Sequence, residues 1–125
     1  MAATLPQDIK LHTKSRTLEL IYSDQESFEL SAEYLRVHSP SAEVRGHGIG
    51  QGVLQTGKQL VGIKGLEPAG NYALKIIFDD GHDSGLYTWD YLYDLCHKQA
   101  TYWNKYLEAL AAAGETRHGN MIAKG

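Results

Sequence analysis

In the first third of the chain, hydrophobic residues alternate with polar ones, the pattern of strands that bury one face. The alternating hydrophobic positions are Ile9 and Leu11, then Leu18, Leu20 and Tyr22, then Phe28 and Leu30. Polar turns separate these segments, so we predict three antiparallel strands. The alternation stops from Ala32 to His38, where Ser31 can cap a short helical turn that ends before Pro40.

Between residues 61 and 87 the pattern predicts further strands and a tight hairpin turn. Val61, Ile63 and then Leu74, Ile76 and Phe78 mark two strands, and the turn between them contains Pro68, Gly70 and Asn71. Asp80-Gly81 tolerates the positive φ of a hairpin turn. A short last strand is expected near Ser84 to Tyr87.

From Thr88 the hydrophobic spacing changes to the three-and-four period of a helix. We predict one helix over Thr88 to Ala113, capped by Thr88 and ended by Gly114. The fold class expected is α+β: a two-layer sandwich in which a mostly antiparallel sheet of five or six strands is packed by this long C-terminal helix. The apolar stripe expected to cover the sheet is Trp89, Leu92, Tyr93, Cys96, Ala100, Trp103, Tyr106, Leu107 and Leu110.

The length of 125 residues fits a single domain, which we place at residues 1–114. Residues 115–125 have almost nothing to bury and are expected to form a disordered tail.

The net charge is 12 minus 15, or -3, with no basic run, which argues against a nucleic-acid partner. The apolar runs are far shorter than the ~20 residues of a membrane span. The lone Cys96 suits a cytoplasmic location.

The segment from Ser39 to Gln59 follows neither period and is expected to be a mobile loop. Its glycines at 46, 48, 50 and 52 could bring backbone N–H groups close to an anion. The segment lacks the strand, the helix and the Lys-Ser/Thr of a phosphate-binding loop, so we favour a turn-rich loop.

Histidines near this loop and on the hairpin offer a candidate metal site for zinc or iron. His82 and Asp83 on the hairpin, with His47 or His38, supply nitrogen and oxygen ligands. The alternative that we favour makes His82 a turn residue hydrogen-bonded to Asp80 or Asp83. No nucleophile motif is present, and Cys96 lies on the apolar stripe, so we lean against an enzyme.

Three separated segments, residues 30–44, 67–73 and 78–89, carry a family resemblance. They read LSAEYLRVHSPSAEV, EPAGNYA and FDDGHDSGLYTW. Together they resemble the bacterial stand-alone members of the gamma-butyrobetaine hydroxylase-like N-terminal domain family, a domain of unknown function. Similar domains also end some iron-sulphur carrier ATPases, which implies a link with iron or iron-sulphur metabolism.

In the carnitine-pathway oxygenases this domain carries a structural zinc held by three cysteines and a histidine. The resemblance places Ser39, Ser41 and Val44 where those cysteines stand, and His82 where the histidine stands. Serine and valine cannot replace thiolates, so the family zinc site is not expected here. The oxygenase activity belongs to a separate jelly-roll domain and is not implied.

Two functions follow as expectations. The first is a non-catalytic binding or accessory module without cofactor, contacting an unknown protein partner through its loop and hairpin. Its candidate binding residues are Arg36, His47, Gly48, Gly50, His82 and Asp83. The alternative is a metal-binding protein or small metal-dependent enzyme that uses His82, Asp83 and His38 or His47.

Overall fold

The structure is a computed structural model that describes residues 5–23, 25–41 and 54–117. In chain order its elements are β1 (Asp8–His12), β2 (Thr17–Ser23), β3 (Glu26–Ser31), α1 (Ala32–Val37), β4 (Ile63–Ala69), β5 (Ala73–Phe78), β6 (Leu86–Thr88), α3 (Trp89–His97) and α4 (Gln99–Ala113). The α+β class and the antiparallel pairing expected from the sequence are confirmed.

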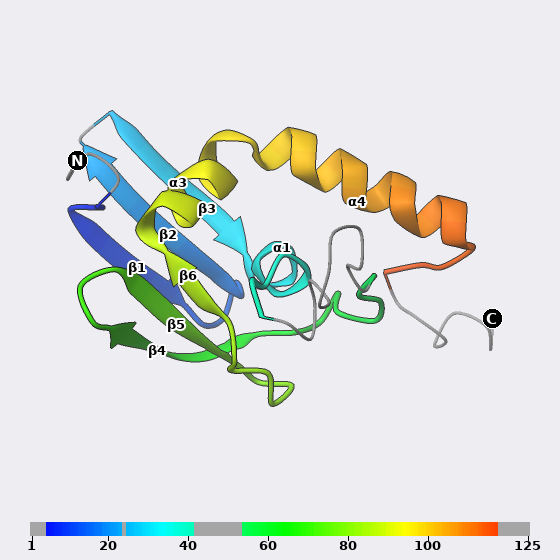
Figure 1. Cartoon of the computed structure of the whole chain (residues 1–125), viewed down its shortest axis with the longest axis horizontal. Coiled ribbons are helices and arrows are strands. Elements are labelled where there is room, and N and C mark those ends of the chain that lie inside the picture. Colours follow the sequence, from blue (N-terminus) through cyan, green and yellow to red (C-terminus); the bar gives the residue numbers. More distant parts are fainter. Residues whose placement is uncertain (1–4, 24, 42–53, 118–125) are drawn as a thin grey trace.

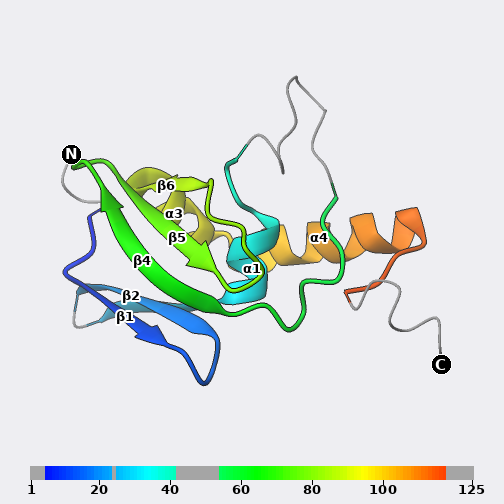
Figure 2. The same cartoon turned by 90° about the horizontal axis from the view of Figure 1, so that it is seen from below.

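The strands form two three-stranded sheets, ordered β1-β2-β3 and β4-β5-β6. Ile9 lies opposite Leu20 in the first sheet, and Leu74 lies opposite Tyr87 in the second. Figures 1 and 2 show the two sheets as neighbours, with α1 and α3 packed beside them. Both sheets contribute to one core, whose members include Leu18, Leu20, Leu30, Ile63, Leu74, Ile76, Phe78 and Tyr87.

The expectation of five or six strands in a single sheet is therefore wrong. Each sheet is a local meander, and α1 followed by residues 38–62 separates β3 from β4 along the chain. Alternation reveals that a strand buries one face, but two sheets that share a core give each strand the same pattern. The period of the sequence carries no information on which strands pair across that gap.

The predicted C-terminal helix is divided into α3 and α4 at Lys98, which has φ −112° and ψ 26°. The Lys98 N–H still bonds the Asp94 carbonyl, and the Lys98 carbonyl accepts from Tyr102 N–H, so the helix bends there rather than stopping. The Thr88 cap and the end at Gly114 are confirmed. The bend lets the two parts bury their apolar residues against different neighbours.

On the core shared by the sheets, α3 buries Leu92, Leu95 and Cys96, while α4 packs the half-buried Tyr102 and Trp103 against it. The helix α4 extends beyond the sheets in both views (Figures 1 and 2) and buries Tyr106 and Leu110 against Val37 of α1. The expectation that the whole stripe covers a sheet is wrong for α4. Within that stripe Trp89, Tyr93 and Trp103 are half-buried, and Ala100 and Leu107 are exposed.

The short helix α1 lies at the centre of this arrangement. Ser31 caps it, as predicted, by accepting a hydrogen bond from the Tyr34 N–H, and all six of its residues are buried. Two buried hydroxyls join it to its neighbours: Tyr34 donates to the Leu95 carbonyl of α3, and Tyr87 of β6 donates to the Leu35 carbonyl. These bonds tie α1 to α3 on one side and to β6 on the other.

Part of the segment expected to be a mobile loop, residues 42–53, lies outside the described residues, as do residues 118–125 of the expected tail. Residues 54–59 are described, and Tyr106 of α4 donates a hydrogen bond to the Gln55 carbonyl. Residue 117 of the expected tail is also described, and Arg117 pairs with Glu33 of α1. Within the described ranges no helix has the length and apolar character needed to span a membrane.

Candidate functional site

His82 lies in the turn that follows β5 and is buried against two serines of the loop that follows α1. Its Nε2 is 2.8 Å from Ser39 Oγ and 3.4 Å from Ser41 Oγ. All three side chains are buried, Ser39 with only 1% of its surface exposed. These are three of the positions at which the resemblance places the family's zinc ligands, and the fourth, Val44, lies outside the described residues.

The local sequence explains why His82 points inward. The Asp80 carboxylate accepts the His82 backbone N–H at 3.1 Å, and the His82 carbonyl accepts the Phe78 N–H at 3.0 Å. Gly81 between them has φ +92°, a conformation that favours glycine. The sequence suggested that His82 is a turn residue hydrogen-bonded to Asp80. The structure shows this bond, which the backbone N–H of His82 donates to the Asp80 carboxylate.

Gly85 closes the cluster from the other side. A side chain at this position would overlap Ser39 Oγ and come within 3.1 Å of Pro40 Cδ. The backbone of the hairpin therefore packs directly on the serine hydroxyl, and only glycine permits this approach.

The donor set of this cluster does not fit zinc. Zinc in proteins takes thiolates, imidazoles and carboxylates, whereas two of the three side chains here are neutral hydroxyls bonded to the third. Across the described part of the chain, no group of three or more His, Cys, Asp or Glu side chains could hold a metal ion. The other proposed ligand from the loop, His47, lies outside the described residues, as do Gly48 and Gly50.

The remaining metal candidates among the described residues are His38 and Asp83. The His38 ring Nδ1 donates to the Tyr34 carbonyl at 2.8 Å, and its ring lies 4.8 Å from that of Tyr34 and 5.9 Å from that of Tyr102. Burial lowers the pKa of His38, although the bond to the Tyr34 carbonyl raises it. Asp83 follows His82 in the turn and is exposed.

Arg36, a candidate binding residue, is itself buried and belongs to an ion-pair network with the partly exposed Asp80 and Lys58 beside the His82 turn. Its Nε donates to Asp80 Oδ2 at 3.0 Å and its Nη1 to Gln55 Oε1 at 3.1 Å, while Lys58 Nζ lies 3.2 Å from the same carboxylate oxygen. Burial alone would raise the pKa of Asp80. The His82 N–H, Lys58 and Arg36 outweigh burial and lower it. Arg36 therefore ties α1 to the turn.

Ser39 and His82 have the separation of a nucleophile and its base. However, both side chains are buried, and the Gly85 backbone covers the hydroxyl. A substrate carbonyl could not reach Ser39 Oγ without opening the hairpin. The cluster therefore acts chemically as a hydrogen-bonded junction between two loops.

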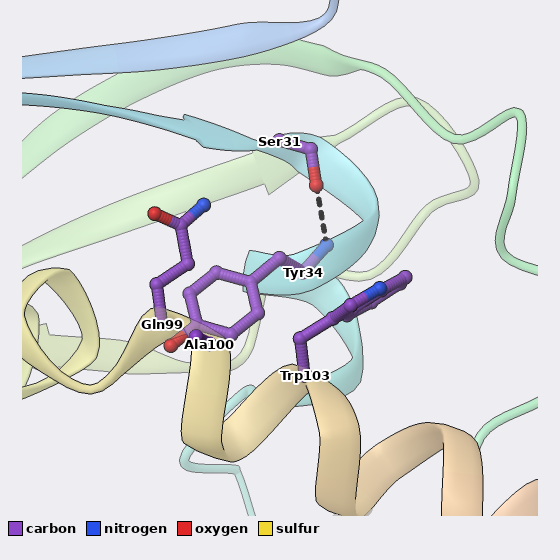
Figure 3. A pocket seen from close by; sticks show the side chains of 5 residues that line it. All are labelled: Ser31, Tyr34, Gln99, Ala100 and Trp103. Carbon is purple, nitrogen blue, oxygen red and sulfur yellow. Dashed lines mark hydrogen bonds between the residues drawn. The ribbon is translucent and has the colours of Figure 1, made fainter.

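Two hollows elsewhere on the described surface are open to solvent. The first, of about 250 Å³, is lined by Ser31, Tyr34, Gln99, Ala100 and Trp103 (Figure 3). In this hollow, Ser31 Oγ accepts a hydrogen bond from the Tyr34 N–H, and the Tyr34 hydroxyl donates one to the Leu95 carbonyl. These two polar groups thus serve the fold of α1.

The second hollow, of about 320 Å³, lies where β6 passes into α3 and is lined by Tyr72, Thr88, Trp89 and Asp90. We call it the Tyr72–Trp89 groove.

The hydrophobic spacing of the sequence places Trp89 on the core-facing stripe and gives no signal for Tyr72 as a functional residue. Both residues lie in the segments that carry the family resemblance, and this is the one feature of the sequence that could have pointed to them as functional residues. Nothing in the sequence pattern could have selected Gln55 or Lys58, because their partners are distant in the chain.

Comparison with known proteins agrees with the resemblance. Residues 9–93 match the family model described as gamma-butyrobetaine hydroxylase-like, N-terminal. Two proteins solved by NMR in solution are 59% and 51% identical, with TM-scores of 0.79 and 0.75. Each covers 90% of this chain, and the matches span 88% and 83% of those chains.

A crystal structure from Acidithiobacillus ferrooxidans, described as a DUF971 family protein of unknown function, is 34% identical with a TM-score of 0.62. The match covers 76% of this chain and 96% of that one. None of the curated proteins compared with the sequence is significantly similar to it.

Proposed function

Because this chain belongs to the gamma-butyrobetaine hydroxylase-like N-terminal family, and its His82 site is closed by serine hydroxyls, we propose that it is a non-catalytic binding module that serves as an accessory to another protein. The observation that carries the proposal is the burial of Ser39, Ser41 and His82 against one another. A group that reacts with a substrate must be reached by it, and these side chains are not.

The chemistry of the chain favours a protein as the partner. Its net charge of -3 and the absence of any basic run in the sequence oppose binding to nucleic acid or to an anionic membrane. The buried, unpaired Cys96 suits a reducing compartment, so we place the module in the cytoplasm. The family resemblance supports a partner in iron or iron-sulphur metabolism.

Elemental analysis of protein purified without a histidine tag tests the proposal against a metal-dependent function. We expect less than one tenth of an equivalent of zinc or iron and the same thermal midpoint before and after treatment with a chelator. Near one equivalent of metal that His82→Ala removes would overturn the proposal. The matched variant His12→Ala, which changes a half-buried histidine of β1, controls for surface binding.

Affinity capture from a native lysate tests the binding role. A protein that is retained by the immobilised chain and released by excess free chain would support the proposal. If no protein is released by this competition, the chain has no partner of the proposed kind under those conditions and the binding role fails.

A further inference from the structure

The Tyr72–Trp89 groove combines two aromatic side chains with one carboxylate on the described surface. Tyr72 precedes β5 and has 58% of its surface exposed, while Trp89 begins α3 and is half-buried. Thr88 pairs with Ala73 across the sheet, which brings the turn before β5 next to the start of α3. The groove thus joins the second and third of the segments that carry the family resemblance.

Hydrogen bonds hold the Trp89 side of the groove in place, and the Tyr72 ring lies beside Gly70. Trp89 Nε1 donates to the Asn71 carbonyl at 3.1 Å, and its backbone N–H donates to the Tyr72 carbonyl at 3.2 Å. The Tyr72 ring lies against Gly70, where an added Cβ would be 3.2 Å from Tyr72 Cδ1. Gly70 also has φ +58°, which favours glycine at this turn. The Trp89 side of the groove is therefore preorganised, which lowers the entropy cost of binding.

The charge of the groove favours a cation. Among the described residues that line it, Asp90 alone is charged. The start of a helix can attract an anion, but here the Trp89 N–H is bonded to the Tyr72 carbonyl and the Tyr91 N–H to Thr88 Oγ1. The faces of tryptophan and tyrosine rings attract cations as well.

We propose that the Tyr72–Trp89 groove binds an arginine side chain presented by a partner protein. A guanidinium is planar, so it can stack on an aromatic ring while its edge donates hydrogen bonds to a carboxylate. Leu86 is 40% exposed and lies two residues before Thr88 in β6, so the apolar surface continues beyond the groove for the rest of the partner segment. Aromatic residues and arginine are enriched where protein interfaces bind most strongly.

This inference rests on the proposed binding function and names the partner chemistry. NMR titration of the full ¹⁵N-labelled chain with the blocked peptide acetyl-Gly-Arg-Gly-amide tests it directly. We expect saturable shifts of the Trp89 indole N–H and the Asp90 amide, with about tenfold weaker binding of the citrulline peptide, which is neutral but has nearly the same shape. Equal binding of the two peptides, or shifts centred elsewhere, would overturn the inference.

Two variants with matched controls assign the effect to the groove. Tyr72→Ala and Asp90→Asn should each weaken arginine binding about three- to tenfold. Leu60→Ala, which removes another exposed hydrophobic side chain, and Glu108→Gln, which removes an exposed carboxylate of α4, should leave binding unchanged. Wild-type amide spectra outside the groove confirm that each variant is folded. If the groove variants bind as tightly as the controls, the inference is wrong.

The inference and the proposed function can fail separately. If Tyr72→Ala and Asp90→Asn still capture the same partner as the wild-type chain does, the groove is not the binding surface, although the binding function stands. If the arginine peptide binds the groove and no partner is captured, the groove inference stands and the proposed function fails.

Discussion

The Arg117 guanidinium holds the buried carboxylate of Glu33 through two hydrogen bonds. Nε donates to Oε2 at 2.9 Å and Nη2 to Oε1 at 2.6 Å. The Glu33 side chain is 5% exposed, and the Arg117 side chain is 38% exposed and lies over the Trp103 ring. The chain beyond α4 is thereby attached to α1, and the ion pair neutralises a charge that the fold has removed from water.

Replacement of this arginine should destabilise the protein. Arg117→Met leaves Glu33 buried without this charge partner, and we expect the free energy of unfolding in urea to fall by about 1–3 kcal/mol, given the partial exposure of Arg117. Lys98→Met, which breaks the exposed pair with Asp94, is the matched control and should cost less than about 0.5 kcal/mol. If the free energy of unfolding falls by a similar amount in both variants, the pair between Arg117 and Glu33 stabilises the protein no more than an exposed ion pair does.

The approach of Gly85 to Ser39 predicts a position where one methyl group is not tolerated. Gly85→Ala should lower the free energy of unfolding by about 1–3 kcal/mol, because its Cβ would overlap Ser39 Oγ. Gly65→Ala in β4 is the control, since its Cβ would make ordinary contact with Ile77 Cδ1 at 3.8 Å. Urea unfolding of both variants measures the difference. A Gly85→Ala protein as stable as Gly65→Ala would contradict the closed cluster.

The aromatic surroundings of His38 predict a loss of stability in mild acid. Burial lowers its folded pKa below the unfolded value of about 6.5. The folded state thus binds fewer protons than the unfolded state, and stability falls as the pH drops through 6.5 toward the folded pKa. His38→Gln should reduce this fall, measured as the free energy of unfolding at pH 7.5 and 5.5.

His97 provides the opposite case on the same chain. Its hydrogen bond to the Tyr93 carbonyl raises its pKa above 6.5, and the bond to Glu26 adds to this effect. Its stabilising contribution is therefore present below pH 6.5 and lost as the pH rises through the folded pKa. His97→Gln should make the fall in acid steeper. The same pH slope in both variants would contradict these assignments.

Cys96 should be unreactive in the folded protein. It is 3% exposed, and burial raises the pKa of its thiol to about 12, so thiolate is scarce at neutral pH. We expect a disulfide reagent at pH 8 to modify Cys96 only as fast as the protein unfolds, and one thiol to react at once in denaturant. Ala100→Cys places a second thiol at an exposed position of α4 and should react rapidly. Fast modification of the wild-type protein would place Cys96 at an accessible surface.

The local elements were predictable because their causes are local. Ser31 and the residues after it contain the cap and the break in alternation that produce α1, and Thr88 marks the start of α3 in the same way. The Asp80-Gly81 turn needs only a residue that accepts positive φ. The family resemblance, carried by three short segments, is confirmed by the match over residues 9–93.

The candidate site was predictable only in part. The resemblance linked Ser39 and Ser41 with His82 across 43 and 41 residues, and the structure brings them within hydrogen-bond distance. The sequence pattern could not predict that Arg36 forms an ion pair with Asp80, because 44 residues separate the two. It also treated Trp89 as fully buried core, since a helical period cannot distinguish a buried position from one at the rim of a groove.

The sequence by itself determined the strands, the helical segments, their caps and the turns, because backbone propensity and side-chain period act over a few residues. The tertiary structure alone decided that the strands divide into two sheets, that the C-terminal helix bends at Lys98, and that Arg117 returns to Glu33 across 84 residues. Each of these results depends on which apolar faces share a core and which charges must be neutralised inside it. Such requirements arise only when distant parts of the chain are packed together.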